Sequence, residues 1–245
     1  MDMLSIQNLA VEIEGKEILH DVTLSLGIGE THALFGPNGS GKTTLLMAIM
    51  GFPRYRITSG KIILQGQDIT NMCLDERARL GIGMSFQRPP VVRGVSTRDV
   101  VLASTRGMIH EQAIEGLARR LNVVDLMGRE VNYGFSGGEI KRSELMQLMA
   151  QSPHLVLLDE PDSGVDLVNI ALVGQMIKEL LEKDLRCNRI RSGLIITHTG
   201  HILDYVHAGR GYVMVEGRII AEGEAGQILD CIKRKGYEGC VRCQG

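Results

Sequence analysis

A phosphate-binding loop is indicated by eight consecutive residues, Gly36-Pro37-Asn38-Gly39-Ser40-Gly41-Lys42-Thr43. They match the pattern G-x-x-x-x-G-K-[ST], in which glycines let backbone N–H groups turn toward phosphate oxygens at the start of a helix. Lys42 is expected to reach the β- and γ-phosphates of ATP, and Thr43, followed by Thr44, to ligate Mg²⁺ through its hydroxyl. A chance glycine-rich turn is the alternative, and the predicted strand 31–35 and helix 43–50 on either side disfavour it.

An acidic pair follows a run of four apolar residues, Leu155-Val156-Leu157-Leu158. Such a run without alternation is typical of a strand that is covered on both faces. Asp159 at its end is expected to hold Mg²⁺ through the water shell of the metal, and Glu160 to polarise the attacking water. A surface acid pair after a buried strand is the alternative, and the phosphate-binding loop in the same chain argues against it.

These motifs need an α/β scaffold, and the apolar spacing of the chain predicts one. Alternating residues indicate strands within 4–13 and 22–28, and spacings of three and four indicate mostly helical structure in 96–128. The interval 88–150 is therefore expected to be a helical subdomain set into an α/β core. Further predicted elements are a hairpin arm at 60–70, a helix at 169–183, a strand at 194–196, a hairpin at 212–222 and a last helix at 225–235.

The composition of the 245 residues excludes several classes of protein. Hydrophobic residues make up 44% and charged residues 23%, which excludes a disordered or low-complexity chain. With 27 basic and 29 acidic residues, no broad nucleic-acid-binding surface is expected. No apolar run approaches the about 18 residues of a membrane-spanning helix, and we expect no secretory signal. Five sparse cysteines predict reduced thiols, and so a cytoplasmic protein that meets a membrane only through a partner.

Four further segments resemble motifs of the ABC ATPase family. Phe135-Ser136-Gly137-Gly138-Glu139 resembles the family signature, where a Ser hydroxyl and N–H groups at a helix N-terminus can hold phosphate. Gln87 resembles the Q-loop glutamine, which contacts Mg²⁺ and couples to a partner. The segment 163–166 resembles the D-loop, and His198 resembles the switch histidine on the γ-phosphate, with a hydrogen-bonded histidine at a strand end as the alternative. Six motifs thus stand in family order between residues 4 and 222.

The resemblance implies the fold of an ABC-type P-loop ATPase over residues 1–245. This α/β domain has a RecA-like core, an antiparallel β subdomain and the helical subdomain inserted at 88–150. A C-terminal helix and a cysteine-containing tail are expected at 225–245.

The resemblance also implies Mg²⁺-dependent hydrolysis of ATP by two chains that sandwich two ATP molecules head to tail. In such a dimer the segment Ser136 to Glu139 of each chain acts on the ATP that the other chain holds. The implied catalytic residues are Glu160, His198 and Lys42, and the implied metal residues are Thr43, Gln87 and Asp159.

Within the family, three segments resemble SufC, the ATPase subunit of the SUF iron–sulfur cluster assembly scaffold. They are Met84-Ser85-Phe86-Gln87-Arg88-Pro89, Phe135-Ser136-Gly137-Gly138-Glu139-Ile140-Lys141-Arg142 and Asp162-Ser163-Gly164-Val165-Asp166. Pro161 and the compact interval 87–135 depart from many SufC chains. This resemblance implies a scaffold subunit that docks near Gln87, and the cytosolic ATPase subunit of an ABC importer is the alternative.

Two further expectations concern whether the chain hydrolyses ATP and how Glu160 is held before ATP binds. A dimerisation module that binds nucleotide without hydrolysing it is another class of function, which the intact Lys42, Asp159, Glu160 and His198 disfavour. By resemblance to SufC-type ATPases, Lys141 is expected to pair with Glu160 in the nucleotide-free monomer, against the alternative of a solvent-facing lysine.

Ile13 stands where the family normally has an aromatic residue that stacks on adenine. Isoleucine packs on a purine but offers no π-stacking, which removes about 1 kcal/mol on the scale of aromatic pairs. SufC-like chains also tend to lack this aromatic. Weak or base-promiscuous nucleotide binding by the monomer is expected.

The C-terminal tail carries Cys231, Cys240 and Cys243. A single C-x₂-C is a weak metal signal, because a closed zinc site needs four ligands. We therefore favour a solvated tail with reduced thiols over an iron or zinc site. The chain alone is expected to carry no stoichiometric metal, so that any metal binding needs a partner.

Overall fold

The computed structural model describes residues 2–105, 107, 110–181 and 191–241 of the chain. The described elements include both strands and helices, and the predicted α/β class is confirmed. No helix in these residues combines the length and the apolar character that are needed to cross a membrane.

A six-stranded sheet forms the centre of the protein, in the order β12-β11-β3-β10-β9-β6. Its strands are β3 (Thr31–Phe35), β6 (Ile82–Ser85), β9 (Leu155–Asp159), β10 (Ser192–Ile196), β11 (Arg210–Val215) and β12 (Arg218–Glu224). All neighbours are parallel except β11 and β12. Because parallel strands end at the same edge of a sheet, the segments that follow β3, β6, β9 and β10 meet there.

The apolar run of β9 is buried on both faces, as predicted. Leu155 and Leu157 belong to one hydrophobic core, and Val156 and Leu158 belong to a second core on the other face. This alternation places Asp159 at the end of a strand that solvent reaches from neither side.

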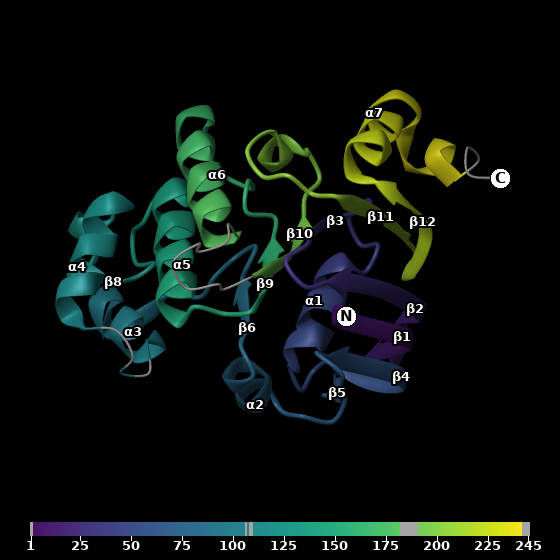
Figure 1. The fold of residues 1–245 in the computed structure, drawn as a ribbon, viewed down its shortest axis with the longest axis horizontal. Coiled ribbons are helices and arrows are strands. Elements are labelled where there is room, and N and C mark those ends of the chain that lie inside the picture. The colour runs from purple at the N-terminus through teal and green to yellow at the C-terminus, as the bar shows by residue number, and fades with distance from the viewer. Residues whose placement is uncertain (1, 106, 108–109, 182–190, 242–245) are drawn as a thin grey trace.

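An antiparallel sheet and one helix form the first of these cores. The sheet has the order β2-β1-β4-β5, with β1 (Asp2–Ile13), β2 (Lys16–Gly27), β4 (Arg56–Leu64) and β5 (Gln67–Asp68). Helix α1 (Lys42–Met50) packs beside it (Figure 1). In the short helix α2 (Leu74–Arg79), the buried Arg77 guanidinium donates to the carbonyl oxygens of Ala48 and Ile49 at 2.7 and 2.9 Å. Arg77 thereby satisfies carbonyl groups at the C-terminal end of α1.

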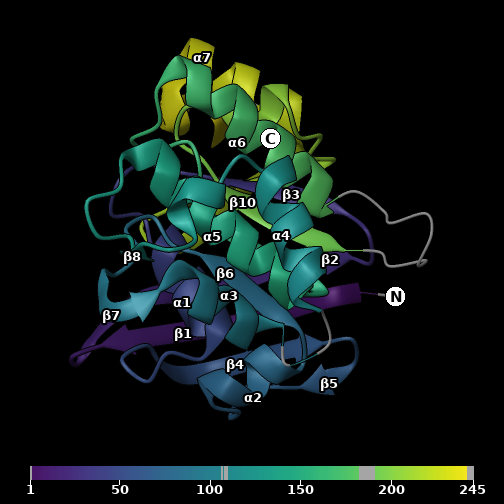
Figure 2. The same ribbon diagram turned by 90° about the vertical axis from the view of Figure 1, so that its left-hand side faces the viewer.

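Helices cover the sheet on the side away from the antiparallel strands (Figures 1 and 2). They are α3 (Thr97–Ser104), α4 (Glu111–Arg120), the 3₁₀ turn η1 (Val124–Leu126), α5 (Gly137–Gln151) and α6 (Leu167–Leu181). All but α6 begin within the predicted interval 88–150. The mostly helical prediction for 96–128 missed two short strands that flank it, β7 (Val92–Ser96) and β8 (Glu130–Val131), which pair with each other.

The chain closes with a 3₁₀ turn, η2 (His201–Asp204), the β11–β12 hairpin and helix α7 (Ala225–Val241). Helix α7 is longer than the predicted 225–235 and bends at Gly236, which has a φ of 70°. The Cα atoms of two residues nine apart would lie about 14 Å apart in a straight helix, whereas those of Cys231 and Cys240 are 5.7 Å apart. The two form a disulfide, so the expectation of reduced thiols is wrong for this pair, and Cys243 lies outside the described residues.

Candidate functional site

One hollow of about 350 Å³ brings four of the predicted motifs together. Its lining residues are Ile18, Asn38, Gly39, Ser40, Gly41, Lys42, Thr43, Thr44, Gln87, Glu160 and His198. Apart from Ile18, they come from segments that follow β3, β6, β9 and β10 at the carboxyl edge of the sheet. This is the edge at which open α/β sheets bind their ligands.

The loop between β3 and α1 is shaped to present backbone N–H groups. Gly39 and Gly41 have φ angles of 78° and 105°, which glycine adopts without strain. Gly41 is the N-cap of α1, and no side chain caps this end of the helix. The loop also packs tightly on β11, since a Cβ at Gly36 would lie 2.2 Å from the Met214 carbonyl oxygen. An uncapped helix N-terminus behind a close-packed glycine loop is suited to a phosphate group.

The Lys42 ammonium group is held within this loop. Its Nζ donates to the carbonyl oxygens of Gly36 and Pro37 at 2.9 and 2.8 Å, and the residue is 4% exposed. Burial lowers the pKa of Lys42, whereas the nearby Glu160 and Asp159 carboxylates raise it. A cation held here can exchange these carbonyl oxygens for phosphate oxygens, which form stronger charge-assisted hydrogen bonds.

Asp159 has two buried carboxylate oxygens, and neither accepts a hydrogen bond of normal geometry from a described residue. Burial raises the pKa of Asp159; the nearby Thr43 hydroxyl opposes the rise and Glu160 adds to it. Buried oxygens without partners are costly, and a divalent cation can supply the missing partner. Mg²⁺ takes oxygen ligands and is commonly held by one or two carboxylates together with phosphates and water. The Asp159 carboxylate and the Thr43 hydroxyl therefore fit Mg²⁺.

A metal site made of protein ligands alone is a different case. Among the described residues, no group of three or more His, Cys, Asp or Glu side chains is arranged to hold a metal ion. Any metal at Asp159 would thus depend on phosphate oxygens and water for its remaining ligands.

Glu160 is held by side chains from two neighbouring strand ends. Its Oε2 accepts a hydrogen bond of 2.6 Å from Gln87 Nε2, and its Oε1 is in direct contact with Nε2 of His198. Glu160 has a φ of 49°, a left-handed conformation that is rare for a residue with a side chain. Its N–H donates to the Ile196 carbonyl oxygen at 3.0 Å, so the end of β10 fixes this turn. Backbone strain of this kind is typically found at functional sites.

A polar contact that no sequence motif predicted joins this turn to the segment that carries His198. Asp162 Oδ2 accepts hydrogen bonds from the hydroxyl groups of Thr197 and Thr199 at 3.0 and 2.6 Å. The two threonines flank His198 in the chain. Their spacing on either side of a candidate histidine is the only sequence signal that could have suggested the contact.

The signature segment lies outside the hollow. Ser136 caps α5, where its hydroxyl accepts from the Glu139 N–H at 3.4 Å and the Glu139 carboxylate accepts from the Ser136 N–H at 2.7 Å. Next to it, a Cβ at Gly137 would lie 2.1 Å from the Gly164 carbonyl oxygen. The signature and the segment 163–166 therefore pack together, and neither lines the hollow.

Ile13 does not line the hollow, where Ile18 lies instead. Ile13 pairs with Lys16 at the tip of the β1–β2 hairpin, and Ile18 follows on the second strand. Both are isoleucines near one turn, so position in the motif order could not distinguish them.

The expected pairing of Lys141 with Glu160 is wrong. The Lys141 ammonium lies 3.6 Å from Oε2 of Glu144, one turn along α5, and donates to the Phe86 carbonyl oxygen at 2.5 Å. The alternative of a solvent-facing lysine is wrong as well, since Lys141 is 3% exposed. Both carboxylate oxygens of Glu160 bond other side chains.

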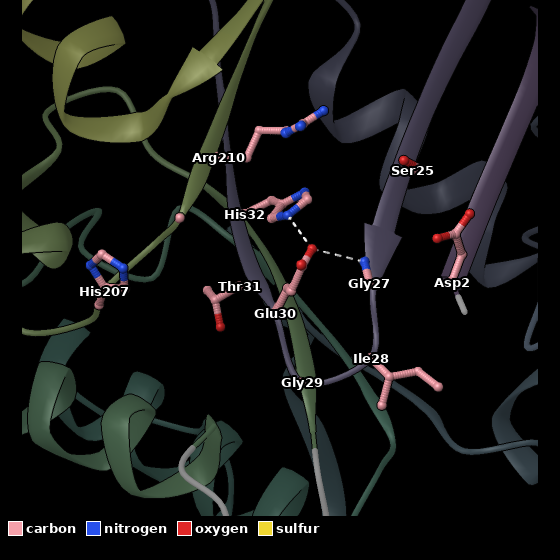
Figure 3. Close-up of a pocket in the computed structure, with 11 residues that line it drawn as sticks. Asp2, Ser25, Gly27, Ile28, Gly29, Glu30, Thr31, His32, His207 and Arg210 are labelled. Atoms are coloured by element: carbon pink, nitrogen blue, oxygen red, sulfur yellow. Dashed lines mark hydrogen bonds and ion pairs between the residues drawn. The ribbon is translucent and has the colours of Figure 1, made fainter.

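A larger hollow of about 890 Å³ lies at the other end of β3 (Figure 3). Glu30 Oε2 is 2.9 Å from His32 Nε2 and accepts from the Gly27 N–H at 3.0 Å. Burial lowers the pKa of His32, and the Glu30 carboxylate opposes this shift. None of the predicted motif residues lines this hollow, and none of the described helices begins at its lining residues, so we place the chemistry in the smaller one.

Comparison with known proteins places the chain among ATP-binding subunits. A family model described as ABC transporter matches residues 19–163. A probable ABC transporter ATP-binding protein of Streptococcus pyogenes is 38% identical over 100% of this chain and 97% of its own length. A probable ATP-dependent transporter, ycf16, of Cyanidium caldarium is 36% identical over 96% and 95%. Vegetative protein 296 of Bacillus subtilis is 37% identical over 96% of this chain and 92% of its own length.

Solved structures agree on the fold. MJ1267, an ATP-binding cassette of an ABC transporter, has a TM-score of 0.78 at 25% identity over 98% of both chains. A bacterial Atm1-family ABC exporter with ATP bound has a TM-score of 0.76 at 21% identity, over 99% of this chain and 42% of the exporter chain. The arrangement of sheets and helices around the hollow is thus similar to that of ATP-binding cassettes.

Proposed function

Since the chain belongs to the ABC transporter family of ATP-binding proteins, we propose that it is a Mg²⁺-dependent ATPase that acts as a dimer on a partner protein. The observation that supports this most is the hollow in which the phosphate-binding loop meets Gln87, Glu160 and His198. A module that only binds nucleotide has no need of a carboxylate held against a histidine beside the phosphate site.

The roles of the side chains follow from their places in the hollow. The N–H groups at the start of α1 and the Lys42 ammonium bind the β- and γ-phosphates of ATP. Thr43 and Asp159 would hold Mg²⁺, which neutralises charge on the phosphate oxygens. Gln87 lines the same hollow, and we propose it as a further residue that would contact this metal.

The chemical step uses Glu160 and His198. Glu160 accepts the proton of the attacking water, a role that typically accelerates a reaction about 10²- to 10⁴-fold. His198 orients the Glu160 carboxylate through the contact of its Nε2 with Oε1 of Glu160, and it contacts the γ-phosphate. Gln87 holds the other carboxylate oxygen, Oε2, through a hydrogen bond of 2.6 Å from its Nε2.

Dimerisation is proposed from the position of the signature. Ser136, Gly137, Gly138 and Glu139 form a second helix N-terminus, on α5, that does not line the hollow of its own chain. A phosphate bound there would come from the ATP of a second copy. ATP is therefore expected to join two chains, and its hydrolysis to release them.

For the partner, we favour a soluble SUF-type scaffold subunit that docks beside the Q-loop in the cytoplasm. The SufC-like segments support this choice. A groove of about 210 Å³ beside Gln87 offers a docking place, and its rim includes the exposed Val92 at 38%. Asn132 lines the same groove and has a buried Oδ1 without a hydrogen bond from a described residue. The relatives named as a probable ABC transporter ATP-binding protein and a probable ATP-dependent transporter favour the second candidate, an ATPase subunit that docks on a membrane permease.

Two measurements test the proposal. ATP hydrolysis by the purified chain is expected to require Mg²⁺ and to stop on adding excess EDTA; hydrolysis that continues without a divalent cation would refute the assigned role of Asp159. Affinity purification from the native cell, followed by mass spectrometry, identifies the partner. Recovery of a soluble scaffold subunit supports the SUF assignment, and recovery of a multi-span membrane protein supports the transporter.

A further inference from the structure

We propose that Lys141 and Glu144 of α5 are positioning residues, which hold the backbone of the Q-loop so that Gln87 stays on Glu160. Glu144 Oε1 accepts from the Phe86 N–H at 2.9 Å, and Lys141 Nζ donates to the Phe86 carbonyl oxygen at 2.5 Å. Both polar backbone groups of one residue are thus bound by one helix. We call these two side chains the α5 clamp.

The α5 clamp has further contacts on either side of Phe86. The Ser85 hydroxyl donates to Glu144 Oε2 at 3.2 Å, and Lys141 Nζ reaches the Gln87 carbonyl oxygen at 3.4 Å. The three consecutive residues 85–87 are therefore bound to α5, and the last of them, Gln87, bonds Glu160 through its side chain. A shift of α5 must move Gln87 with it.

The clamp is needed because β6 is the edge strand of the sheet. One side of β6 pairs with β9, and the other side has no neighbouring strand among the described elements. Side chains of α5 cover that edge at both ends, since Gln151 Nε2 donates to the Ile82 carbonyl oxygen at 3.1 Å. The contact at Gln151 covers the edge alone, whereas the contacts at Phe86 also fix the residue that touches the catalytic carboxylate.

Burial makes the geometry of the clamp strict. The side chains of Lys141 and Glu144 are 3% and 7% exposed. Burial lowers the pKa of Lys141 and raises the pKa of Glu144, and in both cases the charge of the other partner opposes the shift. A buried ion pair of this kind adds little net stability over apolar side chains of the same size, because its desolvation cost offsets the attraction. Its role here therefore lies in the backbone groups that it positions rather than in stability.

This inference rests on the proposed ATPase function, and a comparison of variants tests it. Lys141→Met/Glu144→Leu removes the clamp and keeps an apolar side chain in each buried place. A misplacement of about 1 Å can cost 100-fold in rate. We expect kcat to fall at least tenfold, with the Kd for an ATP analogue changed less than about twofold because the phosphate-binding loop is untouched. Gln151→Leu is the matched control, which disturbs the other end of the same edge and should leave kcat unchanged.

A second test, in the Gln87→Ala background, distinguishes a clamp that acts through Gln87 from a clamp that only stabilises the fold. If the clamp acts through Gln87, adding Lys141→Met/Glu144→Leu to Gln87→Ala lowers kcat by less than about twofold, since the contact is already lost. Persistence of the full loss in that background overturns the proposal, as does a clamp variant with more than half the wild-type kcat. Glu144→Gln keeps an acceptor for the Phe86 N–H, so it should retain most of the kcat that Glu144→Leu loses.

Amide hydrogen exchange at Phe86 separates this inference from the proposed function. In the wild-type protein and in Gln151→Leu, the Phe86 N–H is expected to exchange slowly, and in Glu144→Leu at least ten times faster. A chain without ATPase activity would refute the proposed function and still permit this measurement. Equal exchange at Phe86 in Glu144→Leu and in the wild type would refute the clamp itself.

Discussion

Gln87 donates a 2.6 Å hydrogen bond to Oε2 of Glu160, although 72 residues separate them in the chain. The sheet explains the contact, because β6 and β9 are parallel neighbours with Ser85 opposite Leu158. Each strand ends shortly before the residue that makes the contact. The Q-loop and the acidic pair are thus brought together by strand pairing, before any nucleotide binds.

The buried Asp159 carboxylate accepts no hydrogen bond of normal geometry from a described residue, so we expect its replacement by an amide to stabilise the folded protein. The pKa of Asp159 is raised because the folded state disfavours the charged carboxylate. The protonated carboxyl group contributes its full stabilisation of the folded state below the usual pKa of about 4, and this contribution is lost as the pH rises through the folded-state pKa. Asp159→Asn should therefore stabilise the nucleotide-free protein at pH 7 by about 1 kcal/mol, or about 2–4 °C in Tm. Thermal unfolding from pH 3 to 8 measures this.

The gain should shrink as the pH falls toward 4, and Asp159→Asn should lose Mg²⁺-dependent hydrolysis. Asp125→Asn, at an exposed position, is the control and should shift stability by less than about 0.5 kcal/mol. A destabilised Asp159→Asn protein at pH 7 would show that the carboxylate is satisfied in the folded chain.

Close packing at Gly137 predicts a selective loss of dimerisation. Gly137→Ala places a Cβ about 2.1 Å from the Gly164 carbonyl oxygen, so the signature segment must shift. ATP binding to the monomer should persist, because the phosphate-binding loop is elsewhere, while dimerisation of the Glu160→Gln background with Mg-ATP should be lost. Light scattering with and without Mg-ATP measures the association.

Gly116→Ala on α4 is the matched substitution, since a Cβ there meets no atom within 4 Å. It should leave association unchanged and stabilise the helix by about 0.5–1 kcal/mol. A tight dimer in the absence of nucleotide, or an unimpaired Gly137→Ala dimer, contradicts the assigned role of the signature.

The disulfide of α7 predicts a local loss of order on reduction. Closing a loop between residues nine apart is worth about 2–3 kcal/mol in the chain-entropy model. Cys231→Ser should therefore speed amide exchange in the second half of α7 and leave the central sheet unaffected. Peptide mapping without reductant should recover Cys231 linked to Cys240; recovery of both as thiols from oxidised protein would contradict the bond.

The same bond bears on metal binding by the tail. Sulfur atoms joined to each other are not thiolates and cannot close a zinc or iron site. Elemental analysis of the purified chain should find no stoichiometric metal. About one zinc or several irons per chain, lost in Cys240→Ser/Cys243→Ser, would overturn this expectation.

The candidate site was predictable where its chemistry is contiguous in the chain. The glycine loop and the apolar run before Asp159 each carry their signal within eight residues, so strand, loop and motif could be read together. The order of the strands in the sheet could not be predicted in this way, because it depends on contacts between segments far apart in the chain. Strand β6 was missed because Ile82–Ser85 is four residues long and contains a glycine, which makes its alternation too short to recognise.

The missed contacts share one physical cause. Lys141 and Glu144 are charged residues on a helix, and such residues usually face solvent, yet the edge strand beside α5 gives both of them backbone partners. Arg77 is buried for the same reason, because it satisfies the end of α1. In each case the hydrogen-bond partners come from segments that tertiary structure brings close, and no local sequence pattern predicts them.

Steady-state hydrolysis of saturating Mg-ATP by Glu160→Gln tests the central claim most directly. The amide keeps the size of the side chain and removes its ability to accept the proton of water, so turnover should fall about 10²- to 10⁴-fold while ATP still binds. Glu216→Gln is the control, because Glu216 is another glutamate with a positive φ but is exposed and does not line the hollow; it should hydrolyse ATP at the wild-type rate. A Glu160→Gln protein that retains more than half the wild-type rate would contradict the account.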